Sequence, residues 1–215
     1  MNETSPPFHI RRLEAKDIPT VISIDRLVFR DPWPESAYVQ ELYFNPNAHY
    51  FVLQLTPEML RQNSREQNSR AQDYRTQSRR THSWTERRAA LTSQIVGFVG
   101  MRVEVERGHI STLALRPEWR GWGLGELLLH TAVDQAIHNG AQTVALEVRV
   151  SNAVAQNLYA KYNFVVVSKL RGYYVDGEDA YYMRANVAEQ AYHTYLRQRR
   201  AQLEHRFHPQ PASIA

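Results

Sequence analysis

The chain has 215 residues, of which 43% are hydrophobic and none is cysteine. This length allows one domain with a full hydrophobic core, and the missing Cys excludes disulfides, thiolate zinc sites and a cysteine nucleophile. The formal charge of +4 lies in segment 56–94, whose eight Arg and four acidic residues leave 18 basic and 18 acidic residues for the rest of the chain. The excess charge therefore belongs to one segment and not to the folded body.

The first half of the chain predicts a strand at 8–13, helices at 17–29 and 35–43, and a strand at 49–55. We expect the Asp17 side chain to cap the first of these helices, with Pro19 in its permissive first turn. Residues 1–7 lack the apolar core of a secretory signal. Since no run approaches the ~18 apolar residues of a membrane span, we expect a cytoplasmic protein with no membrane partner.

Segment 56–94 repeats the sequence Gln-Asn-Ser-Arg at 62–65 and 67–70, and then more loosely. Four of its Arg residues recur every five positions, at 65, 70, 75 and 80, which fits neither a helix nor a strand. Because it holds almost nothing to bury, the segment is predicted to be disordered. Two interpretations stay open: a tolerated surface insertion, or a basic arm that contacts RNA or an acidic partner.

In the second half, strands are predicted at 95–105, 108–115, 143–150, 165–170 and 180–183. A helix is predicted to begin at Leu124 and stop at Asn139-Gly140, and a second helix is predicted to be capped by Asn152. A polar helix is predicted at 187–206. The order indicates antiparallel hairpins and one parallel crossover, hence a mixed α/β sheet with helices on its faces. We expect a single domain at 1–185, interrupted by 56–94, and a polar helical extension at 186–215.

The sequence Arg-Gly-Trp-Gly-Leu-Gly at 120–125 lies where a strand becomes a helix. Its backbone N–H groups can converge on one anion, and a side chain in place of any of the three glycines could block a phosphate. Glu126 stands where a dinucleotide fingerprint needs its third glycine, and the Gly-Lys-Ser/Thr of a triphosphate loop is absent. Taken alone, the loop is a weak signal that also fits a plain glycine-rich turn.

Its surroundings are more specific. The run 110–129 resembles the acetyl-coenzyme-A motif of the GNAT (GCN5-related N-acetyltransferase) superfamily, and 146–164 resembles the second half of that fold. The string Gly-Tyr-Tyr-Val-Asp-Gly-Glu-Asp-Ala-Tyr-Tyr-Met at 172–183, with Asp-Pro-Trp-Pro at 31–34, resembles the RimI-like ribosomal-protein alanine N-acetyltransferases. The resemblance covers about 8–55 and 95–184. It implies the acyl-CoA N-acyltransferase fold, with a mostly antiparallel sheet, one parallel crossover and helices on both faces.

The resemblance also implies acetyl-CoA as co-substrate, held by its pyrophosphate on the glycine loop. The implied cofactor-binding residues are Leu113, Ala114, Leu115, Arg120, Gly121, Trp122, Gly123, Leu124, Gly125, Glu126 and Asn152. Asn152 could serve only as a helix cap. Glu126 departs from the family pattern, because its carboxylate would repel a nearby phosphate; Arg116 or Arg120 could offset it. The nine His show no metal-ligand spacing, so we expect no metal.

Two residues match the family's catalytic positions: Glu147 as proton acceptor and Tyr159 as proton donor. A protein α-amine has a pKa of ~7.7–8.0, so a carboxylate near it can take its proton as the amine attacks a thioester. A backbone N–H near Leu115 could then stabilise the oxyanion, and the phenol could protonate the departing thiolate. The plainer alternatives are an ion pair between Glu147 and Arg149, and core packing for Tyr159.

Trp33, Tyr173 and Tyr174 match the family's peptide-side wall, although aromatic residues there could equally be core. The function implied is an N-α-acetyltransferase that acts on a protein N-terminus, the N-terminal alanine of a small-subunit ribosomal protein. One alternative is a GNAT enzyme for lysine or a small amine. Another is a non-catalytic GNAT-fold protein that docks on RNA or the ribosome through 56–94.

Overall fold

A computed structural model describes residues 8–56 and 95–207. The segment 56–94, for which disorder and a contact with RNA are predicted, lies outside these residues except for Thr56. The strands are β1 (Phe8–Arg12), β2 (Ala48–Leu55), β3 (Ile95–Glu104), β4 (Arg107–Leu115), β5 (Thr143–Arg149), β6 (Val165–Leu170) and β7 (Ala180–Asn186). The α-helices are α1 (Ile18–Val28), α2 (Glu35–Phe44), α5 (Leu124–His138), α6 (Ala153–Ala160) and α7 (Gln190–Phe207), with short 3-10 turns at Ala15–Asp17 and Pro117–Trp119.

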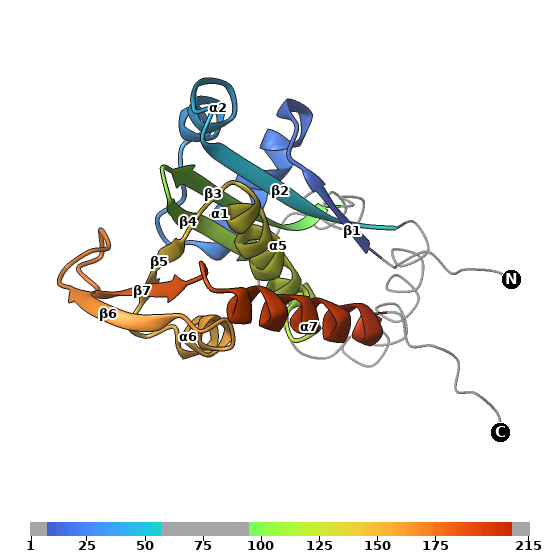
Figure 1. The fold of residues 1–215 in the computed structure, drawn as a ribbon. Helices are drawn as coiled ribbons and strands as arrows, with labels where there is room; N and C mark the ends of the chain where they lie inside the picture. The colour runs from blue at the N-terminus through green and yellow to red at the C-terminus, as the bar shows by residue number, and fades with distance from the viewer. Residues whose placement is uncertain (1–7, 57–94, 208–215) are drawn as a thin grey trace, which may run out of the picture.

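The seven described strands form one sheet in the order β1-β2-β3-β4-β5-β7-β6. Among them only β4 and β5 are parallel; the other neighbouring pairs are antiparallel. The parallel pair is joined through α5, as expected of a strand-helix-strand unit. The predicted mixed sheet with one parallel crossover is therefore confirmed (Figure 1).

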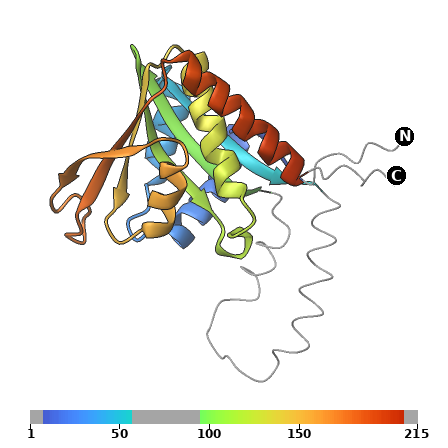
Figure 2. The same cartoon turned by 60° about the horizontal axis from the view of Figure 1, so that its bottom comes forward.

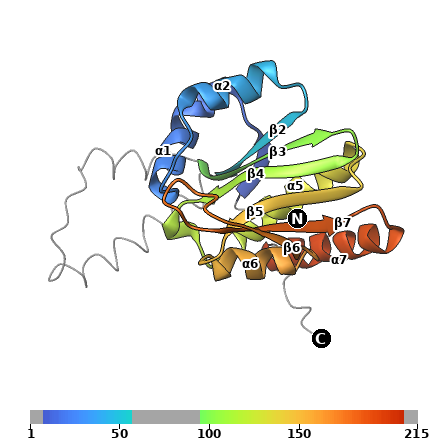
Figure 3. The ribbon, with the colours of Figure 1, turned by 90° about the vertical axis from the view of Figure 1, so that its left-hand side faces the viewer.

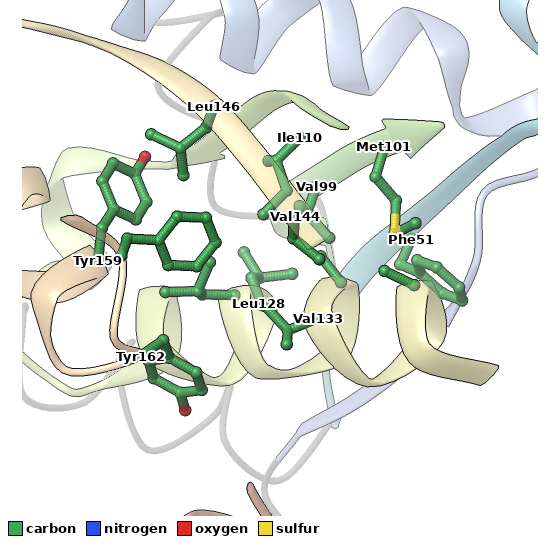
Figure 4. Packing of buried hydrophobic residues seen from close by; sticks show 14 of the residues in the cluster. Phe51, Val99, Met101, Ile110, Leu128, Val133, Val144, Leu146, Tyr159 and Tyr162 are labelled. Atoms are coloured by element: carbon green, nitrogen blue, oxygen red, sulfur yellow. The ribbon is translucent and has the colours of Figure 1, made fainter. Parts of the chain in front are cut away.

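Helices cover both faces of the sheet (Figure 3). Helices α1 and α2 bury one apolar cluster, which contains Ile24, Tyr38 and Phe98. Helices α5 and α7 bury a second and larger cluster on the opposite face, part of which is drawn in Figure 4. Two separate cores clamp the sheet from both sides and so fix the positions of the strand ends that carry polar groups.

The parallel pair separates soon after it begins. Strands β4 and β5 are paired only from Arg107–His109 on β4 to Thr143–Ala145 on β5. Beyond this point β4 runs on to Leu115 and stays paired with β3, while β5 runs on to Arg149 paired with β7. The facing edges of β4 and β5 therefore leave backbone N–H and C=O groups open toward each other, which is where a ligand can add its own hydrogen bonds.

Local turn chemistry agrees with the sequence at both ends of α6. The Asn152 side chain accepts a hydrogen bond from the Ala155 N–H at 3.1 Å, as a helix cap should. After the helix, Asn163 takes a left-handed conformation with φ of 58°, which Asn tolerates better than most residues. Both positions behave as predicted, so they set where the helix begins and ends.

The prediction for Asp17 is wrong in one respect. Helix α1 begins at Ile18, but the Asp17 side chain makes no capping bond to it. Its carboxylate instead accepts from the Arg11 guanidinium at 2.6 and 2.9 Å and from the Glu14 N–H at 2.9 Å. The Arg11 partner comes from β1 and is a charged donor, so it outcompetes a neutral backbone N–H. Asp17 thus ties α1 to the sheet.

The C-terminal helix α7 packs against α5, as Figure 2 shows. Tyr192, Leu196 and Leu203 are buried along its inner face. The Tyr192 hydroxyl donates to the Tyr162 carbonyl at 3.0 Å, and the ring of Phe207 meets that of Phe8 edge-on at 4.5 Å. No helix of the described residues is long and apolar enough to cross a membrane.

Candidate active site

The glycine loop forms the N-terminus of α5. Gly121 and Gly123 have φ of 83° and 88°, a region that favours glycine. A Cβ on Gly121 would meet nothing within 4 Å, so the loop can be approached closely. In the described part of the chain no acceptor is found for the N–H groups of the consecutive residues 121–125. Such a run of free donors at a helix N-terminus suits the diphosphate of acetyl-CoA.

The open edge of β4 suits the rest of that molecule. Leu113, Ala114 and Leu115 pair with β3 on one side, but face no strand on the side of β5. The backbone groups that point to this side can bond the amides of an extended ligand arm, as a neighbouring strand would, although the Leu115 carbonyl already accepts from Arg120 Nε. The residues present therefore fit acetyl-CoA at both the loop and the strand. Asn152 lies at the start of α6 as a cap, and its contact with a cofactor stays a prediction.

Glu147 lies on β5 where the two strands separate. Its Oε2 is 2.8 Å from Nε2 of His109 on β4. Glu147 follows Ala145, the last β5 residue paired with β4, by two positions. The side chains of Glu147 and His109 are 16% and 26% exposed, so both are reachable but partly desolvated. The predicted alternative, an ion pair with Arg149, is wrong because Arg149 binds Asp176 and Glu178 at 2.9 and 2.8 Å.

His109 was missed by the sequence analysis. A histidine in an apolar strand belongs to no motif, and the spacing of the nine His along the chain points only to the absence of a metal-ligand pattern. In the described part of the chain, no group of three or more His, Cys, Asp or Glu residues could hold a metal. The only signal for His109 is the parallel register of β4 with β5, which brings it beside Glu147 across 38 positions of sequence.

Tyr173 completes this polar group from the loop between β6 and β7. Burial raises the pKa of Tyr173, and so do the charge and hydrogen bond of Glu147. Its ring meets Tyr174 edge-on at 5.1 Å. Arg149 lies 3.8 Å above the Tyr174 ring, and burial raises the pKa of Tyr174 to about 12. Both phenols therefore remain protonated near neutral pH and can donate hydrogen bonds.

Tyr159 lies on α6 and is 8% exposed. Its ring lies 6.0 Å from that of Phe164, and its hydroxyl end faces Leu146 of β5 in Figure 4. Burial raises the pKa of Tyr159, and the charge of Tyr174 adds to the effect. The phenol is thus both part of the core and a group that holds its proton until a stronger base forms nearby.

Glu126 is 6% exposed and is paired with two cations, Lys161 at 3.3 Å and Arg199. The expectation that Arg116 or Arg120 offsets its charge is wrong. Arg116 is buried and donates to the Ser23 hydroxyl at 3.1 Å, while Arg120 Nε donates to the Leu115 carbonyl at 3.3 Å. Glu126 finds its partners after α6 and on α7, on the side of the helix away from β4.

The three aromatic residues predicted to form the peptide-side wall of the site, Trp33, Tyr173 and Tyr174, fall into two groups. The ring of Trp33 packs on Tyr38 at 5.7 Å, and the backbone N–H of Trp33 donates to the Asp25 carboxylate at 2.6 Å. Tyr173 and Tyr174 lie in the loop before β7. Arg30 binds Asp176 at 3.0 Å, which ties the loop after α1 to this one. The two loops are therefore neighbours, although the ring of Trp33 belongs to the core of α1 and α2.

Comparison with known proteins agrees with this geometry. Residues 50–164 match the model of the acetyltransferase (GNAT) family. The chain belongs to the GNAT family of acetyltransferases. The sequence analysis predicted both this family and its fold, and both predictions are confirmed.

Relatives of the GNAT chain extend over most of its length. A protein of Bacillus subtilis described as a candidate ribosomal protein bS18-alanine N-acetyltransferase is 29% identical over 84% of this chain and 96% of its own. An N-alpha-acetyltransferase of Sulfurisphaera tokodaii is 29% identical over 83% of this chain and 92% of its own. The ribosomal-protein-S18-alanine N-acetyltransferase of Escherichia coli has a similar fold, with a TM-score of 0.61, 24% identity, and coverage of 85% and 95%.

Proposed function

We propose that this GNAT enzyme is an N-α-acetyltransferase that uses acetyl-CoA and acts on the N-terminal amine of a protein. The observation that carries the proposal is the pair of Glu147 and His109, 2.8 Å apart at the point where β4 and β5 separate. The pair lies on the edge that leads to the free N–H groups of the glycine loop. A base and an anion site on one open edge suit amine acylation.

Three side chains and one backbone N–H group have roles in the proposed transfer. Bound acetyl-CoA supplies a thioester whose acetyl group becomes the amide of the product. The Glu147 carboxylate takes a proton from the incoming ammonium, directly or through one water, and frees its lone pair. His109 holds that carboxylate in place through Nε2. As the amine forms its bond to the acetyl carbon and the carbon–sulfur bond breaks, the Tyr159 hydroxyl would donate a proton to the departing thiolate. A backbone N–H of β4 would stabilise the charge on the carbonyl oxygen.

For the acceptor, we infer the N-terminal alanine of a small-subunit ribosomal protein. The relatives in Bacillus subtilis and Escherichia coli support this choice by name. Tyr173 and Tyr174 would cover the first residue of such a peptide, because their loop is fixed beside the site by Arg30 and Arg149. Other N-alpha-acetyltransferases are similarly related, so other N-terminal residues are the nearest competitors.

The test is acetylation by the full chain of synthetic peptides that differ at their first residue. One series begins with the N-terminal alanine sequence of a small-subunit ribosomal protein, and a matched series carries a blocked N-terminus and one internal lysine. Mass spectrometry locates the added acetyl group. Acetyl on the α-amine of the alanine peptide supports the proposal. Transfer only to the lysine, or transfer at the rate without enzyme, contradicts it.

Contact with RNA through 56–94 remains a separate prediction. Deleting 56–94 should leave peptide acetylation unchanged, whereas an RNA-docking role predicts that the deletion abolishes RNA binding and its dependence on salt. RNA binding with an unchanged salt slope in the deletion variant would remove that hypothesis.

A further inference from the structure

Helix α7 lies beyond the residues that match the family model, yet its last turn reaches the glycine loop. The helix is fixed by Tyr192, Leu196 and Leu203, which are buried. It runs beside α5 in Figure 2, and its C-terminal end lies toward the N-terminal end of α5. A helix held in this way can present side chains at defined positions near the loop.

The first contribution of α7 is to remove a repulsion. Glu126 is buried in the first turn of α5, where its charge would oppose a phosphate on the loop. Arg199 of α7 and Lys161 both pair with this carboxylate. The two positive charges outweigh the negative charge of Glu126. Glu126 therefore does not weaken the attraction between the loop N–H groups and a bound anion.

The second contribution is a free cation. A Cβ built on Gly123 would lie 2.7 Å from Nη1 of Arg206, so this guanidinium lies directly on the loop. In the described parts of the chain no carboxylate pairs with Arg206. Its guanidinium lies 5.9 Å from the ring centre of the neighbouring Phe207. An unpaired guanidinium beside free backbone donors is suited to a phosphate oxygen.

A hollow beside the loop has the matching chemistry. It has a volume of about 530 Å³ and is lined by Arg120, Gly121, Trp122, Arg206 and Phe207, among others. Its described lining includes two guanidinium groups and no carboxylate. Trp122 is half exposed and offers a ring face. The rest of the lining is apolar and consists of Phe8, Leu55, Trp119 and Leu124. The two guanidinium groups on the side of the loop can bind phosphate oxygens, and the aromatic rings can pack on a base.

We infer that α7 is part of the acetyl-CoA site, and that Arg206 binds a phosphate at the nucleotide end of the coenzyme. The inference rests on the proposed function, since it requires that the chain bind this coenzyme. It gives the C-terminal extension a role in cofactor affinity that is separate from the transfer chemistry at Glu147 and Tyr159.

The test is calorimetric binding of coenzyme A and of 3′-dephospho-coenzyme A to the full chain and to Arg206→Gln. Arg197→Gln is the matched control, because Arg197 is exposed on the same helix, bonds only Thr194 among the described residues, and its loss changes the net charge equally. We expect Arg206→Gln to weaken coenzyme A binding about 10-fold, as the loss of one charge-assisted hydrogen bond would, and Arg197→Gln to change it less than 2-fold.

The two ligands separate the two phosphate positions. If Arg206 binds the 3′-phosphate, Arg206→Gln should not weaken the binding of 3′-dephospho-coenzyme A. If Arg206 binds the diphosphate, Arg206→Gln should weaken the binding of both ligands. Equal affinities for the Arg206→Gln and Arg197→Gln proteins would overturn the inference. Failure of the unmodified chain to bind either ligand would instead overturn the proposed function. Equal thermal midpoints for the two variants would show that both are folded.

Discussion

Two regions of this enzyme each hold a partly or fully buried glutamate, and their surroundings differ. Where β4 and β5 separate, Glu147 is bonded to His109, with Tyr173 nearby. At the start of α5, Glu126 is enclosed by Lys161 and Arg199. An imidazole can donate or accept a hydrogen bond and a phenol can do both, whereas an ammonium and a guanidinium only donate and carry a charge. Under the proposed function the first region moves a proton, whereas the second pairs a buried carboxylate with two cations.

The comparison teaches that burial alone does not identify a catalytic carboxylate. Glu126 is the more buried of the two, at 6% exposure, and it lies closer to the glycine loop along the sequence. Its carboxylate is already paired with two cations, Lys161 and Arg199. Glu147 retains some exposure and faces an open edge of the sheet, so an incoming amine can reach it.

The largest expected effect is at the proton acceptor. Glu147→Gln keeps the size of the side chain but removes its basicity, so kcat should fall about 100- to 1,000-fold. Coenzyme affinity measured by calorimetry should change little, because the loop is untouched. Glu104→Gln, an exposed change at the end of β3, serves as the control. An unchanged kcat in Glu147→Gln would show that another group takes the proton.

The next effect is at the proton donor. Tyr159→Phe removes only the hydroxyl from a packed ring, so kcat should fall about 10- to 100-fold. Tyr162→Phe is a matched control, since Tyr162 is also buried but its hydroxyl points away from the other labelled side chains in Figure 4. Equal turnover numbers for the two Phe variants, measured by release of free thiol, would contradict the assignment.

A smaller effect should follow from removing the partner of Glu147. His109→Leu leaves the carboxylate without its Nε2 partner, and we expect about a 10-fold loss in kcat. His109→Gln can still offer an N–H at a similar reach and should recover most of that loss. If the Leu and Gln variants lose the same activity, the hydrogen bond is not what matters at this position.

The second region should respond in stability rather than in chemistry. Glu126→Gln leaves Arg199 and Lys161 without their shared carboxylate, and we expect the free energy of unfolding to fall by about 1–3 kcal/mol. Urea titration measures the change, and kcat at saturating coenzyme should stay within a factor of two or three. A large loss of kcat with unchanged stability would reverse the contrast drawn between the two glutamates.

The smallest effect concerns His130, which is buried between α5 and α7 with neither ring nitrogen bonded in the described structure. Burial lowers the pKa of His130, opposed by Asp134, Glu126 and Glu204 and assisted by Arg200. Below the unfolded pKa of about 6.5 the unfolded chain therefore takes up a proton that the folded chain does not. The free energy of unfolding should fall as the pH drops from 7.5 to 5.5.

His130→Gln should flatten that fall, because its side chain does not titrate. The control is His138→Gln, an exposed change at the end of α5. Urea unfolding of both variants at the two pH values provides the measurement. A slope for His130→Gln equal to that of the unmodified chain would assign the pH dependence to other groups.

Much of the architecture could be predicted from local patterns. The strand and helix bounds around α5 and α6 agree with the structure to within a few residues, because Gly123, Gly140, Asn152 and Asn163 fix turns by their own conformational preferences. The glycine loop was likewise visible in the sequence, and its resemblance indicated the GNAT family before any geometry was known. These features depend on residues that are near one another in the chain.

The pairings around the two glutamates could not be predicted in this way. His109 meets Glu147 across 38 positions, and Arg199 meets Glu126 across 73. Sequence reasoning proposed Arg149, Arg116 and Arg120 as partners because they are close in the chain, and the structure assigns all three elsewhere. Nearness along the chain is a poor guide to side-chain contacts between elements that meet only after folding.

By itself, the sequence determined the kinds of elements, the position of the glycine loop and the family, because each follows from residues within one turn, one strand or one motif. The tertiary structure alone decided which imidazole faces the Glu147 carboxylate and which guanidinium groups surround the loop. The reason is physical: strand register and helix docking are set by burial of two whole apolar faces, and the polar contacts between distant elements follow from that packing.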